Sequence, residues 1–302
     1  FRSVLNRSSV RAKRGDLKLL AQRTYGLEPQ SPALILFPFD DWAEDPHGAL
    51  FKGGKLAILL EYLTEGMQWQ DNDRVAVLAS YGWFYGILTA LSATFAGKTT
   101  LIESSLGELR ENLEKLAPTA VVCGPAFVES LATEIRARVE ATPDFIKHGE
   151  ARNTFSLKGA MKVVGEKAAK RYIYEPLRAD LGRALERIYL AGGTLDREIG
   201  EVLETAGVAM LSMWGLPEAG ISHVERTGSR SQNSVGRPLQ GYVCKIEGAK
   251  TDEAGQVLLR GDVLFDGYWD EKGPLAFTES GYLATGREGR VRSAYLFLED
   301  VD

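Results

Sequence analysis

Short apolar runs alternate with helix-like segments along the first half of this chain, and this alternation constrains the fold more than any other feature. The runs have the length of strands, and the segments between them have the spacing of amphipathic helices. We expect strands at Ala33–Phe37, Arg74–Ala79, Thr99–Glu103 and Thr119–Cys123, with helices at Leu50–Leu63, Trp83–Ala96, Leu106–Leu116 and Ala126–Val139. Strands joined through helices run parallel, so the order predicts an α/β fold: a mostly parallel sheet covered by helices on both faces.

The second half of the chain continues the sheet and then changes character. Leu185–Leu190 and Val208–Met213 read as two more strands of the sheet. Beyond Gly228 the chain consists of short strands and turns, which predicts a small β-rich subdomain. We therefore divide the chain into an N-terminal helical lead and linker (residues 1–30), an α/β core (31–228) and a β-rich subdomain (229–302).

Composition excludes several classes of protein. The chain has 302 residues, 44% of them hydrophobic, and no apolar run approaches the ~18 residues that a membrane span needs. A net charge of −5 argues against nucleic acid as the main partner. Cys123 and Cys244 lie in apolar contexts without zinc-type spacing, so we expect buried thiols and a cytoplasmic location. Because Phe1 is neither an initiator methionine nor part of a signal peptide, we expect the chain to begin inside a longer protein.

Two of the expected strands end in residues that suit a ligand site. One strand is followed by Gly192-Gly193, and the next ends in Trp214-Gly-Leu-Pro-Glu218. In open α/β sheets, ligands bind in the crevice beyond the carboxyl ends of the strands. These two strand ends are about one helix apart in sequence, so together they predict the floor of a nucleotide-sized pocket.

Six segments along the chain form a further pattern through their order and spacing. They are Phe95–Leu101, Tyr174–Gly182 followed by Ala191-Gly-Gly193, Ser234–Gly241, Gly255–Gly261, Phe265–Trp269 and Phe277–Gly286. In order and spacing they resemble the motifs of the AMP-forming adenylating enzymes, the acyl-CoA synthetases and their relatives, and most of all the long-chain fatty-acyl branch. The resemblance implies a role in fatty acid metabolism as a ligase. Members of that family also carry a long segment before the first matching strand and a mobile C-terminal lid, and both are absent from this sequence.

The resemblance implies roles for the residues at the two strand ends. Gly192 and Gly193 match a pair whose backbone lies against adenine, although glycine is also the usual residue of a strand-to-helix turn. Trp214 matches an aromatic that stacks on adenine, and Gly215 follows it. Glu218 matches the acid that contacts Mg²⁺. We define the nucleotide-like cleft by Gly192, Gly193, Trp214, Gly215 and Arg287, the last being the residue that stands in place of a ribose-binding aspartate.

Several positions depart from the family pattern. Pro217 replaces a threonine that donates to phosphate, and proline offers neither a hydroxyl nor an N–H. Arg287 has donors only and cannot accept hydrogen bonds from ribose hydroxyls. At the hinge before the lid, Asp300-Val301 replaces Gly-Arg. The losses fall on phosphate, ribose and hinge positions, while the packing motifs persist.

The phosphate loop is also changed. Its Ser/Thr donors are gone, His47 stands where a lysine would be, and the loop carries four carboxylates, Asp40, Asp41, Glu44 and Asp45. A carboxylate ~4 Å from a phosphate charge near a protein surface repels it by about 4 kcal/mol before screening, so this loop opposes the binding of a triphosphate. A metal site and a solvated surface turn both fit this loop. We favour the turn, and expect no metal site, because no ordered ligand spacing appears. A further hypothesis is that Arg287 pairs with this acidic loop.

An aromatic wall replaces the family's acyl-pocket histidine. Tyr81, Trp83 and Phe84 occupy the matching stretch. Packing at a strand–helix junction explains these rings most simply, and an acyl or aromatic ligand pocket is the alternative.

Two functions remain in view. The first is an acyl-CoA synthetase-like core that is catalytically inactive or severely weakened and acts as a binding, regulatory or partner subunit, as an oligomer or with another chain. The second is an active AMP-forming ligase whose missing parts are dispensable or supplied by a partner, and only this one requires ATP, Mg²⁺ and CoA. An unrelated P-loop NTPase, suggested by Gly97-Lys-Thr99, is set aside because the required upstream glycine is Ser92 and the segment opens a strand.

Overall fold

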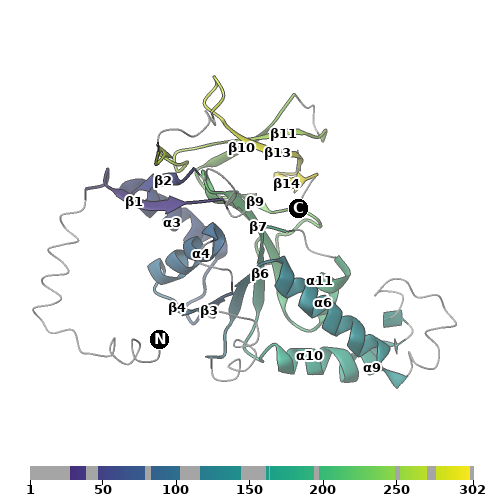
Figure 1. Cartoon of the computed structure of the whole chain (residues 1–302). Coiled ribbons are helices and arrows are strands. Elements are labelled where there is room, and N and C mark those ends of the chain that lie inside the picture. The colour runs from purple at the N-terminus through teal and green to yellow at the C-terminus, as the bar shows by residue number, and fades with distance from the viewer. Residues whose placement is uncertain are drawn as a thin grey trace, which may run out of the picture.

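A computed structural model describes residues 28–38, 47–78, 83–102, 116–143, 161–162, 164–193, 197–248, 252–270 and 277–299. Its centre is a seven-stranded sheet in the order β4-β3-β5-β6-β7-β8-β9 (Figure 1). The first five strands of this order are parallel, and they are β4 (Thr99–Ile102), β3 (Arg74–Val77), β5 (Ala120–Cys123), β6 (Arg187–Ala191) and β7 (Ala209–Leu216). Two antiparallel strands, β8 (Gly220–Val224) and β9 (Arg237–Pro238), complete the edge. The predicted α/β class with a mostly parallel sheet is confirmed.

Helices cover both faces of this sheet, as the alternation predicts. One face packs on α3 (Gly53–Met67) and α4 (Phe84–Phe95). The other packs on α6 (Pro125–Glu140), α9 (Glu166–Ala169), the π-helical turn η2 (Lys170–Tyr174), α10 (Glu175–Asp180) and α11 (Arg197–Thr205). Strand β5 shows the division, because Ala120 and Val122 join the first cluster while Val121 and Cys123 join the second. A strand buried on both faces reads as a continuous apolar run, which is why β5 was visible in the sequence.

Two antiparallel sheets flank the central one, in the upper part of Figure 1. The first has the order β1-β2-β12, formed by β1 (Pro32–Leu36), β2 (Ala49–Lys52) and β12 (Gly267–Tyr268). The second has the order β10-β11-β13-β14, formed by β10 (Tyr242–Glu247), β11 (Gly255–Gly261), β13 (Leu283–Arg292) and β14 (Tyr295–Leu298). The second sheet is the expected β-rich subdomain. The boundaries at residues 30 and 228 stay predictions.

The helix expected over Leu50–Leu63 forms, but its start was predicted wrongly. Residues Ala49–Lys52 form strand β2, and the helix begins only at Gly53. The expected first strand, now β1, pairs antiparallel with β2 and so lies outside the parallel sheet. Gly53 and Gly54 make the turn compact, because their N–H groups donate to the carbonyls of Ser31 and Pro29. A short run such as Ala49–Lys52 has no helical period of its own, and its pairing partner decides its conformation.

Other expectations fall outside the described residues. The N-terminal helical lead lies almost wholly there, as do most of the expected helix Leu106–Leu116 and the hinge at Asp300-Val301. No helix in the described part of the chain is long and apolar enough to cross a membrane. The thiols of Cys123 and Cys244 are free; the first is buried and the second half-buried, so the expected burial is only partly met for Cys244.

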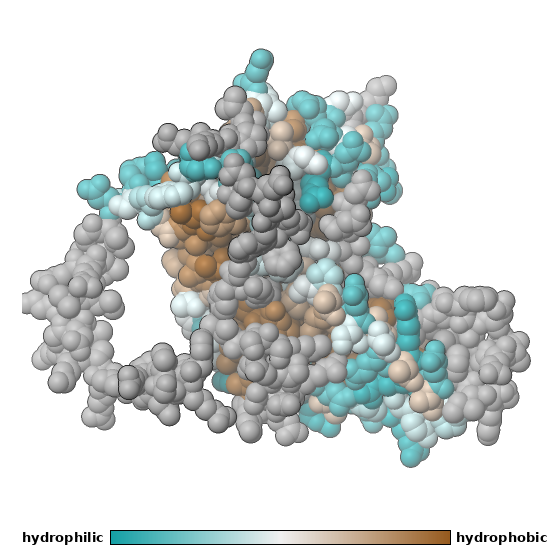
Figure 2. All heavy atoms as spheres, viewed as in Figure 1, coloured by the Kyte–Doolittle hydropathy of each residue, from teal (hydrophilic) through white to brown (hydrophobic). Residues whose placement is uncertain are grey.

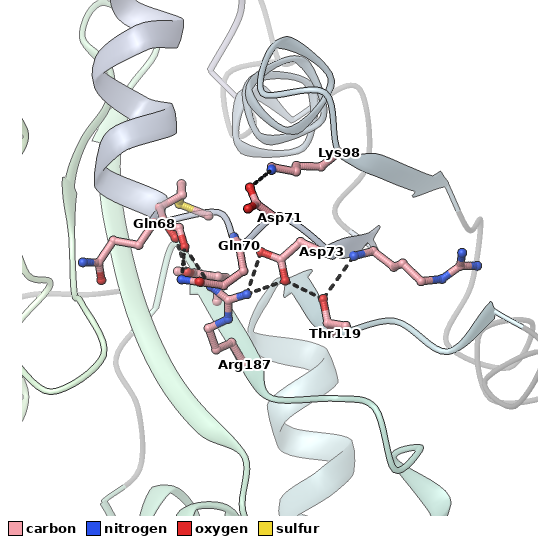
Figure 3. Close-up of polar contacts among 10 residues, drawn as sticks. Gln68, Gln70, Asp71, Asp73, Lys98, Thr119 and Arg187 are labelled. Carbon is pink, nitrogen blue, oxygen red and sulfur yellow. Dashed lines mark hydrogen bonds and ion pairs between the residues drawn. The ribbon is translucent and has the colours of Figure 1, made fainter.

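A buried ion pair ties the amino ends of the central strands together (Figure 3). Arg187, at the start of β6, donates through Nη2 to both carboxylate oxygens of Asp73, at 2.5 and 2.6 Å. Asp73 also accepts from the Thr119 hydroxyl at 2.6 Å and from the Gln70 backbone N–H at 2.6 Å. Arg187 Nη1 donates to the Gln68 carbonyl at 3.1 Å, just after α3. The network therefore joins α3, β3, β5 and β6 in one contact.

We expect Arg187→Met to lower the free energy of unfolding by about 3–5 kcal/mol, because it leaves the Asp73 carboxylate buried, with its side chain 2% exposed, without its cation. Urea denaturation followed by circular dichroism measures this. Lys98→Met is the matched control, since Lys98 pairs at 3.5 Å with the fully exposed Asp71 and its loss should cost less than about 1 kcal/mol. Equal effects of the two substitutions would contradict the role given to the buried pair.

Candidate functional site: a cleft at the carboxyl ends of the parallel strands

The predicted glycines and aromatics lie at one edge of the central sheet. Gly192 and Gly193 directly follow β6, and Trp214 and Gly215 lie in the last part of β7. Because β6 and β7 pair in parallel with Ala191 opposite Met213, the two segments are neighbours in space. The structure thus brings together four of the five residues that define the cleft, at the edge where open α/β sheets bind ligands.

Trp214 is packed into the core. Its side chain is 5% exposed and its ring centre lies 5.4 Å from the ring of His223 on β8. The adjacent Gly215 is required by the chain itself, because a Cβ there would lie 1.9 Å from the Gly220 carbonyl oxygen across the β7–β8 hairpin. Packing within the chain therefore accounts for a tryptophan and a glycine at these two positions without a ligand.

Tyr85 anchors the aromatic wall to the end of β7. Its hydroxyl accepts from the Gly215 N–H at 2.9 Å and donates to the Gly215 carbonyl at 3.3 Å. Burial raises the pKa of Tyr85 well above its usual range, so the phenol stays neutral. Phe84 stacks on Tyr85 at 4.1 Å and is 6% exposed, which makes it a core residue. Tyr81 lies outside the described residues.

Trp83 lies against the backbone at the end of β6. Its ring meets that of Tyr85 edge-on at 4.7 Å. A Cβ added at Gly192 would lie 2.6 Å from Trp83 Cζ2, so the indole approaches the Gly192 backbone directly. A Cβ added at Gly193 would lie 3.0 Å from Cγ of Pro125 in α6. Sequence reasoning named Trp83 and Gly192 separately, and nothing in their spacing signalled this contact.

Glu218 is held by a second segment of the chain. The Tyr268 hydroxyl on β12 donates to Glu218 Oε1 at 2.9 Å, and the Phe265 N–H donates to the Glu218 carbonyl at 2.8 Å. Burial, and then the charge of Glu218, raise the pKa of Tyr268 above its usual range. Pro217, beside it, is buried. Tyr268 was not anticipated as a partner of Glu218, since the two residues are 50 positions apart in sequence.

His47 extends this group of polar residues. Its Nδ1 lies 2.8 Å from Asp270 Oδ2, and its ring centre is 5.6 Å from that of Tyr268. His47 is the residue that stands where the resemblance expects a lysine, and here it is paired with a carboxylate. Within the described ranges, no three His, Cys, Asp or Glu side chains are grouped so that they could hold a metal ion.

Arg287 is exposed on β13, and its charge is felt at the Tyr85 hydroxyl, where it acts to lower the pKa that burial raises. Its backbone N–H donates to the Thr285 hydroxyl at 3.2 Å. The acidic loop Asp40–Asp45 lies outside the described residues, so its pairing with Arg287 stays a prediction.

A cavity that was not expected from the sequence lies beside α11 and the first half of β7. Its volume is about 260 Å³. Glu225 in its wall is 6% exposed and accepts from the Ser212 N–H and the Ser234 hydroxyl, both at 3.0 Å. Burial raises the pKa of Glu225. Arg230 on the same wall is bound by Glu204 and donates to the Met210 carbonyl at 2.9 Å, so these polar groups satisfy one another.

The architecture and the cleft together define a class: this is the fold of the adenylate-forming enzymes. A malonyl-CoA ligase solved with methylmalonyl-CoA and AMP bound superposes with a TM-score of 0.69 and 18% identity, over 92% of this chain and 54% of that one. At that identity the likeness establishes the fold alone.

The family follows from the sequence. Residues 46–269 match the model of the AMP-binding enzyme family, and the chain belongs to that family. A long-chain-fatty-acid–CoA ligase, FadD15 of Mycobacterium bovis, is 31% identical over 124 residues, which cover 40% of this chain and 20% of the ligase. Long-chain-fatty-acid–CoA ligase 2 of Schizosaccharomyces pombe is 24% identical over 213 residues, covering 65% of this chain and 31% of the ligase. The chain thus matches a third or less of the length of these relatives.

His223, packed against Trp214, predicts a pH dependence of stability. It is fully buried, its Nε2 has no hydrogen-bond partner among the residues that the structure describes, and burial lowers its pKa from 6.5 to about 3. Between these values the unfolded chain binds a proton that the native chain does not, so the free energy of unfolding falls as the pH drops from about 6.5 toward 3.

When the pH falls from about 7 to about 5, we expect the free energy of unfolding to drop by about 2 kcal/mol less in His223→Phe than in the parent. Urea denaturation midpoints at the two pH values measure this slope, the change in the free energy of unfolding with pH. His47→Gln serves as the control, since it removes a histidine outside the core. An unchanged slope in His223→Phe would contradict the prediction.

Proposed function

We propose that this chain is an acyl-CoA synthetase-like core that does not adenylate a carboxylate by itself and acts as a binding, regulatory or partner subunit. The observation that carries the proposal is the state of Glu218. By family resemblance it is the acid that contacts Mg²⁺, yet here the Tyr268 hydroxyl donates to it at 2.9 Å and buried Pro217 stands in place of a phosphate-donating threonine.

The surroundings of Glu218 support the same conclusion. Stabilising a transferring phosphoryl group requires preorganised donors and cations aimed at its oxygens. His47, at the position of the expected lysine, is bonded to Asp270 instead. Arg287, at the position of a ribose-binding acid, is a donor without acceptor capacity. Each change removes a contact to nucleotide and keeps the fold.

The remaining ligand chemistry is apolar. The cleft retains the ring of Trp83, which suits an acyl chain more than a polyphosphate. We place the protein in the cytoplasm, where its free thiols Cys123 and Cys244 stay reduced.

ATP–pyrophosphate exchange tests the proposal directly. We expect no exchange above background with a panel of fatty and aromatic acids in the presence of Mg²⁺, because the donors that would hold the α-phosphate are missing. Glu218→Gln is the control that separates this chain's own activity from a contaminant. Exchange by the parent chain that Glu218→Gln abolishes would overturn the proposal and establish the alternative, an active AMP-forming ligase that uses ATP, Mg²⁺ and CoA.

The surface predicts an assembly. Figure 2 shows apolar residues gathered over α3 and α4, beside the β1–β2 hairpin. Ile58 on α3 and Phe95 on α4 are 38% and 57% exposed. Apolar surface of this kind is usually covered in the working form of a protein. We expect light scattering of the purified chain to give an oligomer, or a complex with a co-purifying chain, and a monodisperse monomer would contradict this.

A further inference from the structure

One tryptophan lies against the backbone at the ends of two neighbouring parallel strands. Gly124 directly follows β5 and Gly192 directly follows β6. A Cβ at Gly192 would lie 2.6 Å from Trp83 Cζ2 and 3.1 Å from Cη2, and a Cβ at Gly124 would lie 3.3 Å from Cζ3. These three atoms form one edge of the six-membered ring. The edge of the indole is therefore seated between the two glycines, which leave room for it because they lack side chains.

Several contacts hold Trp83 in this position. The backbone of Trp83 is held at the start of α4, where its carbonyl accepts from the Gly86 N–H at 2.9 Å. Its ring meets Tyr85 at 4.7 Å, and Tyr85 is itself bonded to both backbone groups of Gly215. Contacts thus run from β5 through Trp83 and Tyr85 to β7, across the carboxyl edge of the sheet.

This arrangement gives the glycines a role within the chain. Gly192 has φ of +63°, so its backbone conformation alone favours glycine. Gly124 has φ of −90°, which any residue adopts, and the approach of Trp83 is the contact that leaves no easy room for a Cβ. The family resemblance places adenine against the backbone of Gly192, and in this structure the indole of Trp83 lies there.

We propose that Trp83 is a specificity-determining residue: its indole fills the crevice between the ends of β5 and β6 and excludes a planar ring, such as a nucleoside base, from the backbone of Gly192. The inference deepens the proposed function and rests on the same cleft. It assigns the exclusion of one chemical class, uncharged planar heteroaromatic rings, to one side chain. Removing that side chain leaves an apolar space the size of an indole, and such cavities take up aromatic molecules.

Binding of adenosine and of free indole to the full chain tests the proposal. Adenosine is uncharged, so the lost phosphate contacts do not enter the measurement. We expect no saturable adenosine binding by the parent chain in calorimetry, and at least tenfold tighter binding by Trp83→Ala. Indole should raise the melting temperature of Trp83→Ala and leave that of the parent unchanged. Trp269→Ala, which removes a tryptophan 57% exposed outside this crevice, should gain neither ligand.

Three outcomes would overturn the proposal. They are adenosine binding by the parent as tight as by Trp83→Ala, no gain of either ligand by a folded Trp83→Ala, and an equal gain by Trp269→Ala. If Trp83→Ala does not fold, a double-mutant cycle of Trp83→Leu with Gly124→Ala decides. Gly124→Ala should destabilise the parent and be tolerated better in the Trp83→Leu variant, and additivity would contradict the proposal. Pyrophosphate exchange by the parent would refute the proposed function without touching these binding results.

Discussion

The ion pair between Asp73 and Arg187 is the contact on which the geometry of the central sheet depends. It joins the amino ends of β3, β5 and β6 to the end of α3 through three partners, the Gln70 N–H, the Thr119 hydroxyl and the Gln68 carbonyl. A buried charge pair tolerates little displacement, because separating the two charges leaves each one unsatisfied in a medium of low dielectric constant. The network therefore holds the amino ends of β3, β5 and β6 in place relative to one another.

At the carboxyl edge of the same sheet, close packing of other groups against glycine backbones takes the place of charge pairing. Gly192 admits Trp83, Gly215 admits the Gly220 carbonyl, and Tyr85 bonds to both backbone groups of Gly215. By resemblance to the adenylating enzymes, we predicted that the glycines at this edge lie against a nucleotide. This chain keeps the glycines and places its own atoms against them, so a retained motif does not imply a retained ligand.

Much of the fold was readable from sequence because its strands are buried on both faces. The apolar runs of β3, β5 and β6 and the periodicity of α4 and α6 are local properties, and the elements formed where they indicate. Strand β2 was missed since its four residues carry no period and gain their conformation from pairing with β1 and β12. In the site, the strand ends were foreseeable, whereas the Tyr268–Glu218 bond joins positions too far apart for any local pattern.

The sequence by itself determined the α/β class and the family, because these depend on residue type and order, and by resemblance it predicted the groups lost at Pro217 and Arg287. Only the tertiary structure decided which side chain lies against Gly192. The contact of Trp83 with Gly124 and Gly192 arises where three strand ends and the start of α4 converge, and its partners lie 41 and 109 positions along the chain. Such contacts are set by the packing of whole elements, and packing is a property of the folded chain rather than of any segment.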